Sequence, residues 1–477
     1  MEVINISGLI SISQQKNGTQ QSGPSNIPPE IRNLRAEKIE SKSIAIKYEA
    51  RDPNETILRH FIYLNGAKSE ITDSVSKSEE NTFFYKITNL KVGTIYNIQV
   101  DVSDGIESTK SEAINATTVN SFVYGIRINE NNSNPNGCVT YIGDSSAFSP
   151  GPNSWINKWP FNEVCIIGLK NGEETKKINP NNCQLYVDGS RIPEDVDVMV
   201  RIPKIYYKSI SSGNTYEIKI SNDKVDSGYD CYAHKVSGQE KPYIYIGRYE
   251  SSLINGKLRS VSRKTPLVNE TIGVFRKYAQ ANGINYQQNN WYTRQLVNIL
   301  FMLMYKTLNS QDAVGMGVCN TNGYLNTGYT DTKGMYYGSQ RDNESVSFMG
   351  IENWWGNIRE WIDGMFCDSS YNIKIIPDNK NFNDQANGYV KKGNANSIGG
   401  RCTKVMKSNE LLFFPQSSNG SDSTYYCDYC SVHGGYFGVH GGDYYDRGDA
   451  GAFCLNVYYS ASERNSALGG RLVFFGK

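Results

Sequence analysis

The stretch FMGIENWWGNIREWIDG, residues 348–364, constrains the fold of this chain more than any other. Three tryptophans surround a glycine–asparagine pair in it. Glycine permits a tight backbone turn and asparagine can hydrogen-bond its own chain, while indole rings bury large areas and need partners for their N–H groups. The stretch therefore predicts a buried structural centre in a large domain, built by Trp354, Trp355, Gly356, Asn357 and Trp361.

The end of the chain, residues 441–477, interleaves two kinds of residue. Small and apolar residues recur at 450–453, 460–462 and 469–473, and Tyr, Asp, Asn, Ser and Arg fill the gaps between them. A β-strand over residues 452–459 would place alternate side chains on opposite faces. It would display Cys454, Asn456 and Tyr458 and bury the apolar residues that alternate with them.

The net charge and the distribution of apolar residues argue against several classes of partner. The 477 residues carry a formal net charge of +1 with Lys and Arg scattered among the acids, so we expect no nucleic-acid partner. The longest apolar run, residues 299–304, is far too short to span a bilayer, so we expect no membrane insertion. The opening MEVINISGLISISQQ lacks the basic and apolar regions of a secretory signal, which predicts synthesis in the cytoplasm.

The sequence pattern divides the chain into three parts. Residues 1–27 are polar and aperiodic, as in an arm or linker. Residues 28–119 contain short runs of alternating apolar and polar residues closed by turn residues, which predicts a small β-sandwich. Residues 120–477 contain no second linker and mix β-like runs with two helical stretches, near 270–283 and 289–310, which predicts one large α+β domain. The Leu and Met stripe of the second helix is interpreted as core.

The sandwich region resembles a fibronectin type III domain, above all in NLKVGTIYNIQVDV, residues 89–102. The resemblance implies that Tyr96 bonds back to the upstream backbone and that Tyr48 replaces the usual early tryptophan. Modules of this family are mostly spacers, so no chemistry is assigned to it.

The tryptophan-rich stretch resembles the G-L-x-D-M-x-G-N-V-W-E-W signature of the formylglycine-generating-enzyme branch of the C-type lectin fold, with Arg359 where the signature has tryptophan. The closing GGRLV, with Gly470 and Arg471, resembles the closing G-F-R-L-V strand of that family. The predicted fold class is therefore an α+β C-type lectin fold, preceded by an all-β immunoglobulin-like sandwich of the fibronectin type III kind.

The enzymes of that family suggest an alternative function, an oxidase of the sulfatase-modifying type. Such chemistry needs a pair of reactive thiols or a histidine cluster for iron. Cys454 has no partner cysteine in an equivalent strand, and the four histidines are scattered. We therefore predict no catalytic residues, no enzyme activity, no metal site and no cofactor, with calcium left open.

The closing segment also resembles the variable proteins of diversity-generating retroelements, whose frame reads GG…AGAF…SAS…GxRL with diversified positions between. Tyr, Ser, Gly and Asn are the residues that recognition loops favour. Arg447-Gly448-Asp449 also spells RGD, which we interpret as coincidence rather than as an integrin ligand. The predicted ligand-binding residues are Tyr436, Phe437, His440, Asp443, Tyr444, Tyr445, Asp446, Arg447, Asp449, Cys454, Asn456, Tyr458, Tyr459, Arg464, Asn465 and Ser466.

Together these features predict a receptor-binding protein of a phage tail or tail-like particle. Its partners would be a host-surface protein or glycan at the tyrosine-rich face and other tail or baseplate proteins at the N-terminal arm. Avidity favours a homo-oligomer, most simply a trimer. A bacterial surface adhesin that binds carbohydrate is the other alternative, and the identity of the receptor is not encoded in any motif.

Overall fold

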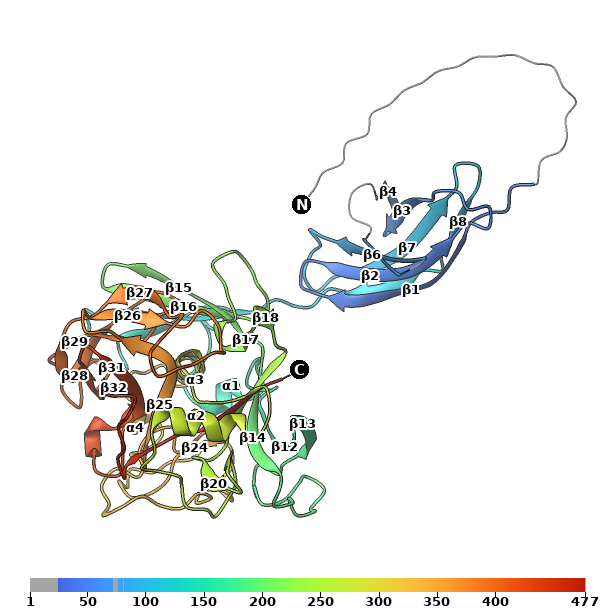
Figure 1. The fold of residues 1–477 in the computed structure, drawn as a ribbon. Helices are drawn as coiled ribbons and strands as arrows, with labels where there is room; N and C mark the ends of the chain where they lie inside the picture. The colour runs from blue at the N-terminus through green and yellow to red at the C-terminus, as the bar shows by residue number, and fades with distance from the viewer. Residues whose placement is uncertain (1–24, 72–75, 80, 477) are drawn as a thin grey trace, which may run out of the picture. The chain divides into compact units, whose positions relative to one another are not determined.

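The computed structural model describes residues 25–71, 76–79 and 81–476. The chain divides into two compact units, Met1–Asn120 and Ser121–Lys477 (Figure 1). The predicted N-terminal arm lies outside the described residues except for its last three positions. Both units are built mostly of β-strands, and the few helices of the described residues all lie in the second unit.

The first unit is a sandwich of two antiparallel sheets. One sheet has the strand order β1 (Glu30–Ile39), β2 (Ile44–Arg51), β6 (Thr82–Ile87) and β5 (Ser76–Glu79). The other has the order β4 (Ala67–Glu70), β3 (Arg59–Leu64), β7 (Ile95–Ser103) and β8 (Ser108–Lys110), with β9 (Ile114–Thr117) also paired to β7.

The core of the sandwich follows from strict alternation along its central strands. In β2, Ile44, Ile46 and Tyr48 are fully buried, and in β7 Ile98 and Val100 are buried as well. Residues two apart share one face of a strand, so the two sheets meet along these side chains. Tyr48 occupies the core as predicted.

The predicted tyrosine corner is present in this unit. The backbone N–H of Lys91 donates to the hydroxyl of Tyr96 at 2.8 Å. The corner fixes the start of β7 against the turn that precedes it, which confirms the expectation for Tyr96.

The second unit contains three larger sheets and several short hairpins. The first sheet has the order β11 (Val139–Gly143), β10 (Val123–Asn129), β16 (Thr215–Ser221) and β15 (Tyr206–Ser212). The second has the order β13 (Glu173–Lys177), β12 (Cys165–Lys170), β14 (Asp197–Pro203), β19 (Tyr243–Gly247), β34 (Leu472–Phe475) and β22 (Tyr286–Gln288). The hairpins are β17 (Lys235–Val236) with β18 (Gln239–Glu240), β20 (Ser252–Ile254) with β21 (Lys257–Arg259), and β23 (Ser347–Phe348) with β24 (Ile351–Glu352).

The third sheet carries the end of the chain. Its order is β27 (Val390–Asn394), β26 (Asn372–Ile375), β25 (Arg359–Cys367), β31 (Tyr436–Gly441), β32 (Gly451–Tyr459), β30 (Tyr429–Val432), β28 (Ile398–Val405) and β29 (Pro415–Ser418). The short β33 (Leu468–Gly469) pairs with β25 in parallel. Strand β32 is thus an interior strand, with β31 on one side and β30 on the other.

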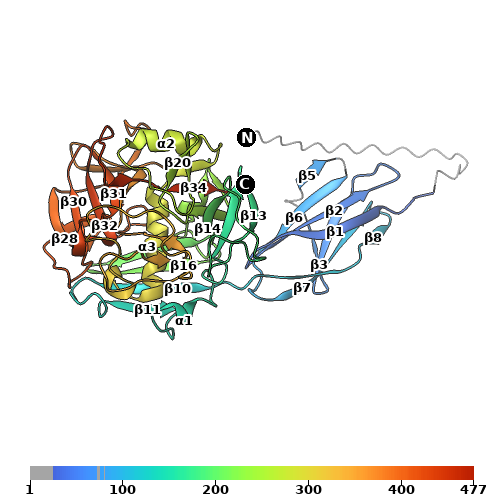
Figure 2. The same ribbon diagram turned by 90° about the horizontal axis from the view of Figure 1, so that it is seen from below.

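Both predicted helices are present. Thr271 caps α2 (Ile272–Gln280), and the side chain of Asn290 caps α3 (Trp291–Tyr305) by accepting from the N–H groups of Tyr292 and Thr293. Helix α3 is buried on all sides from residue 291 to residue 304 and lies in the middle of the unit in both views (Figure 1, Figure 2). The shorter helices are α1 (Pro152–Trp155), α4 (Ser310–Ala313), η1 (Tyr232–His234) and η2 (Arg447–Asp449). Within the described residues, no helix combines the length and the apolar character needed to cross a membrane.

The tryptophan-rich stretch forms the buried centre that its sequence predicts. The indole N–H groups of Trp354, Trp355 and Trp361 donate to Asn298 Oδ1 at 3.0 Å, to the carbonyl of Gly315 at 3.1 Å and to the carbonyl of Glu270 at 3.2 Å. These three partners come from α3 and from two separate loops. The stretch therefore ties distant segments to one sheet.

The turn inside this stretch requires its glycine. Gly356 has a φ of 76°, and a Cβ there would lie 2.8 Å from the carbonyl oxygen of Val318. Asn357 follows with a φ of 64° and donates through its side chain to Glu250 at 2.5 Å. Both residues act as the sequence indicates.

Arg471, in the closing GGRLV, is fully buried and joins the end of the chain to the same centre. Its guanidinium lies 2.5 Å from Glu360 and also donates to the carbonyls of Gly247, Arg248 and Glu352. Burial alone would raise the pKa of Glu360, but Arg471 and His440 lower it to about 2. Glu360 is therefore a carboxylate inside the core.

A candidate binding surface in the closing segment

Strand β32 does not display its polar residues, so the prediction from alternation is wrong for Cys454 and Asn456. Along β32 only Tyr458 is exposed. The reason is that this interior strand is covered on both faces. Seven of its first eight residues, from both faces, are buried. Arg294 and Asn298 of α3 donate to backbone carbonyls of β32, and Asn456 accepts from the hydroxyl of Ser431, its neighbour on β30, at 3.1 Å.

Other predicted contact residues also lie behind the surface. Phe437 packs on Phe366 with 4.9 Å between ring centroids. His440 is buried against Trp354 and lies 3.5 Å from Glu360. The predicted contact residues that are buried are Phe437, His440, Asp443, Cys454, Asn456 and Tyr459. These six residues lie beneath the surface of the closing segment and are not available for contact with a ligand.

The remaining predicted residues are at least partly exposed. Tyr445 is 64% exposed and Tyr458 is 37% exposed, both high for tyrosine. The exposed members are Tyr445, Arg447, Tyr458, Arg464 and Ser466, and the half-buried ones are Tyr436, Tyr444, Asp446, Asp449 and Asn465. We call these ten residues the C-terminal surface.

Arg359, at the start of β25, holds the loop that carries the first tyrosines. Its two terminal nitrogens each lie 2.6 Å from a carboxylate, one from Asp443 and one from Asp446. Burial alone would lower the pKa of Arg359, but the two carboxylates raise it above its usual value, with smaller contributions from Tyr459 and Tyr458. One half-buried cation thus adjoins both the 443–446 loop and the end of β32.

The sequence pattern alone predicts no role for Arg359, which stands out there only as a departure from the family signature. The signal was nevertheless available. An arginine among three indoles needs an anion nearby, although the sequence does not indicate which acidic residue supplies it.

The loop at residues 443–449 is rigidly built. The N–H of Asp443 donates to Asp446 at 2.9 Å, and the N–H of Tyr445 donates to Asp443 at 2.8 Å. The rings of Tyr444 and Tyr445 lie 5.4 Å apart. These contacts present Tyr445 to solvent on a backbone whose polar groups are already paired, so little order is lost on binding.

The RGD tripeptide forms the short helix η2 inside this loop. Asp449 pairs with Arg401 at 2.8 Å, and Arg401 also donates to the carbonyl of Gly448. The aspartate is therefore engaged within the fold.

Tyr458 stands on a stack of aromatic rings. Its ring stacks on that of Tyr459 with 4.4 Å between centroids and 26° between the ring planes, and the two hydroxyls are 3.0 Å apart. Tyr459 in turn meets the edge of Trp361 at 5.8 Å. The tryptophan centre thus supports the displayed tyrosine through one buried ring.

The last loop of the C-terminal surface, residues 460–467, is anchored at two points. Arg464 pairs with Glu270 at 2.6 Å, and the carbonyl of Asn465 accepts from the N–H of Asn269 at 3.0 Å. The side chain of Asn465 accepts from the N–H of Ala467 at 2.8 Å. Ser466 is exposed between these anchors.

The cysteines and the possible metal ligands are further candidates for a site in the described part of the chain. All ten cysteines are free thiols, and burial raises the pKa of Cys454 well above its usual value. Within residues 25–71, 76–79 and 81–476, no three His, Cys, Asp or Glu side chains gather in a group that could hold a metal ion.

Comparison with known proteins identifies one part of the chain. No curated protein matches the chain. A solved structure of a Kfla1895 mutant in complex with isomaltose is similar at 7% identity over 38% of this chain and 28% of that one, with a TM-score of 0.16. The model of the fibronectin type III domain matches residues 28–117. The first unit of this chain is therefore a fibronectin type III domain, as its sequence predicts.

Proposed function

We propose that this chain is a receptor-binding protein of a phage tail or tail-like particle and that its C-terminal surface holds a host-surface protein or glycan. The observation that carries the proposal is the pair of exposed tyrosines on rigid supports, Tyr445 on its hydrogen-bonded loop and Tyr458 on its ring stack. Tyrosine offers a large amphipathic contact area for the loss of two rotors, which suits recognition.

The proposal includes a C-type lectin fold and a variable segment of the diversity-generating retroelement kind. Frame positions of the closing segment are tightly packed, since a Cβ on Gly469 would lie 2.7 Å from the carbonyl oxygen of Leu267. Several gap positions are exposed, among them Arg447, Arg464 and Ser466. A diversified binding site requires this arrangement, in which the frame positions cannot change and the exposed positions between them can.

The rest of the chain would serve attachment and avidity. The fibronectin type III domain would act as a spacer, and the N-terminal arm would dock on the particle. A few tyrosines make a weak single contact, so several copies, most simply a trimer, would raise the effective concentration of the second contact.

The proposal is tested by removing the two exposed rings together. Tyr445→Ala with Tyr458→Ala should lower adsorption of particles to host cells about 30-fold or more, as expected for central aromatic contacts. Tyr329→Ala is the matched control, because Tyr329 is 58% exposed and lies outside the closing segment. Equal adsorption of the double variant and the control would refute the proposed surface.

A separate observation addresses the origin of the segment. We expect the neighbouring genome to contain a reverse transcriptase and a near-copy of the codons for residues 441–477. A genome with neither would remove the retroelement part of the proposal and leave the binding surface untouched.

A further inference from the structure

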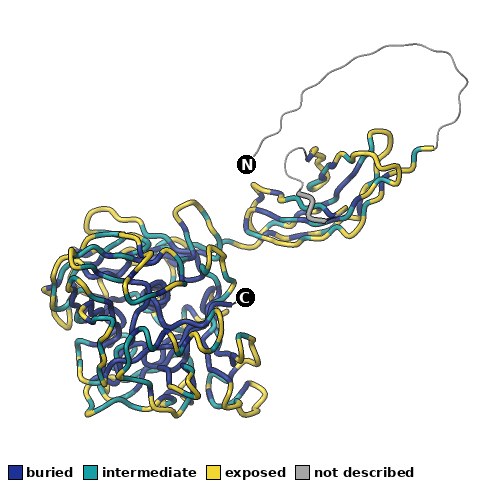
Figure 3. The backbone as a smooth tube through the Cα atoms, viewed as in Figure 1, coloured by how far each residue is buried: buried dark blue, intermediate teal, exposed yellow. Residues whose placement is uncertain are grey.

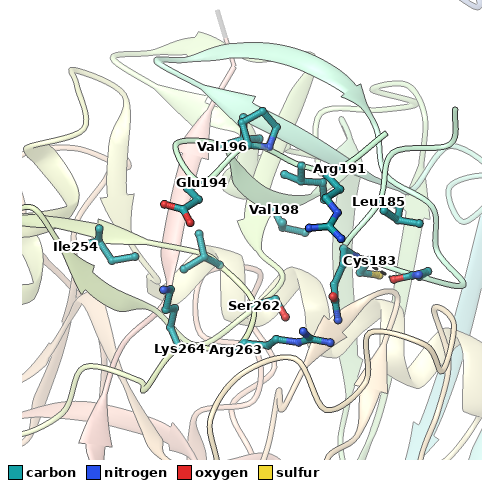
Figure 4. Close-up of a pocket in the computed structure, with 15 residues that line it drawn as sticks. Cys183, Leu185, Arg191, Glu194, Val196, Val198, Ile254, Ser262, Arg263 and Lys264 are labelled. Atoms are coloured by element: carbon teal, nitrogen blue, oxygen red, sulfur yellow. Dashed lines mark hydrogen bonds between the residues drawn. The ribbon is translucent and has the colours of Figure 1, made fainter. Parts of the chain in front are cut away.

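A cavity of about 630 Å³ opens in the second unit, away from the closing segment in sequence (Figure 4). Cavities of this size hold compact organic ligands. Two chain segments form it, the loop from residue 182 to the start of β14, and residues 254–264 around β21. None of its lining residues belongs to the C-terminal surface.

The charge of the cavity lining is unbalanced. Arg191 comes from the first segment and Arg263 and Lys264 from the second, and Figure 4 shows the guanidinium of Arg191 directed into the space between them. Glu194 is the one acidic residue among the lining residues. Within the described residues, the charged side-chain groups of these three cations and of Glu194 make no hydrogen bond or ion pair.

A neighbouring cavity, in which two lining cations have carboxylate partners, serves as an internal comparison. It is about 260 Å³ and shares Ile254 with the first. There Lys170 pairs with Asp195 at 2.6 Å, and Arg259 pairs with Asp197 at 2.8 Å. Two of the three cations that line the smaller cavity are therefore paired, Lys257 being the third, whereas the three cations of the larger cavity are exposed and have no ion pair among the described residues.

The wall and floor of the larger cavity are preformed. Val196, Val198 and Val261 are buried beneath it and give it an apolar base. Ser262 donates to the buried Asp331 at 2.5 Å, and Gln184 donates to the same carboxylate at 3.2 Å. These contacts fix both segments to one buried group, so the cavity keeps its shape without a ligand.

We propose that this cavity binds a small anionic ligand, a carboxylate or phosphate carried on a compact, partly apolar body such as a sugar ring. The cations would hold the anion, since an anion satisfies guanidinium donors that no protein group occupies. The valine base and Leu185 would pack against the apolar face of the ring. This site is independent of the C-terminal surface and would recognise a second, acidic feature of a ligand or surface.

The proposal is tested by calorimetric titration of the full chain with three probes, glucuronic acid, glucose 1-phosphate and glucose. We expect binding of the acidic sugars and none of glucose, and the two acids distinguish a carboxylate from a phosphate preference. Binding should weaken as salt is raised, because salt screens the charges.

Single substitutions of the charged lining residues should change the affinity for the acidic sugars in opposite directions. Arg191→Gln and Arg263→Gln should each weaken binding about tenfold, the effect of losing one charge-assisted hydrogen bond, and Glu194→Gln should strengthen it by removing the opposing charge. Lys224→Gln is the control, because Lys224 is exposed and lies outside the cavity. Tryptophan fluorescence checks that each variant is folded.

Three results would overturn the proposal. They are no binding of either acid, equal binding of glucose and the acids, or an Arg191→Gln variant that binds like Lys224→Gln. Loss of adsorption in the tyrosine variants has no bearing on these outcomes, so the two proposals fail separately.

Discussion

Arg359 lies 2.6 Å from Asp446, a residue 87 positions further along the chain, and this ion pair fixes the tyrosine-bearing loop to the start of β25. The second nitrogen of the same guanidinium reaches Asp443, which is only 4% exposed. Two carboxylates thus compensate for the charge of one guanidinium.

Removing this cation should destabilise the fold. Arg359→Gln leaves Asp443 buried without its partner, which costs about 3 kcal/mol of unfolding free energy. Urea unfolding followed by tryptophan fluorescence measures this, because the six tryptophans all lie between residues 155 and 361.

An exposed pair in the same unit provides the control. Arg127 lies 2.6 Å from Glu217 but is 53% exposed, so Arg127→Gln should cost about 0.5 kcal/mol or less. Similar losses for the two variants would show that the buried Asp443 does not depend on Arg359 as its counter-charge.

The frame of the closing segment should tolerate no added atom at Gly451. A Cβ there would lie 2.1 Å from the carboxylate of Asp428, which is buried and accepts from the N–H of Phe453 at 2.7 Å. We expect Gly451→Ala to lower the unfolding free energy by about 3 kcal/mol, as overpacking of a rigid site does.

Gly323→Ala is the matched substitution for this measurement. A Cβ on Gly323 would meet nothing within 4 Å, and the backbone of neither glycine has a positive φ. The unfolding free energy of the Gly323→Ala variant should be close to that of the unchanged chain. A Gly451→Ala variant of the same stability would contradict the packing described for β32.

Acid should destabilise the second unit through His234. Burial lowers the pKa of His234 from 6.5 to about 3. Below pH 6.5 the unfolded chain binds a proton there and the folded chain does not, so the contribution of His234 is complete above pH 6.5 and is lost as the pH falls toward 3. This one group changes the unfolding free energy by up to about 1.4 kcal/mol per pH unit.

The measurement is a series of urea unfolding curves between pH 3 and pH 7. His234→Phe should flatten the dependence over this interval. Repeating the series at high salt provides the control, because a shift caused by burial is insensitive to screening. Parallel curves for the variant and the unchanged chain would rule out His234 as the source.

Local patterns in the sequence predicted the parts of the fold that local chemistry determines. The tyrosine corner at Tyr96, the buried stripe of α3 and the turn at Gly356 each depend on a few neighbouring residues, and each is present. Figure 3 shows the buried residues gathered in the interior of each unit, and exposed residues in the outer loops and in edge strands such as β4 and β13.

The candidate site was predicted less well because tertiary packing decides it. Alternation states which residues of β32 share a face, but it does not state that both faces are covered. Cys454 and Asn456 were therefore placed on the surface and are buried. Arg359 was missed as a functional residue because its partners are remote in sequence.

The fibronectin type III domain can be tested apart from the second unit within the intact chain. Tyr96→Phe removes the hydroxyl that accepts from Lys91 at 2.8 Å and should cost about 1 kcal/mol. Because all six tryptophans lie in the second unit, far-ultraviolet circular dichroism should show an earlier transition while tryptophan fluorescence stays unchanged. Tyr85→Phe, at a half-buried position of β6, is the control and should leave both signals in place. A shift of the fluorescence transition by Tyr96→Phe would mean that the two units do not unfold independently.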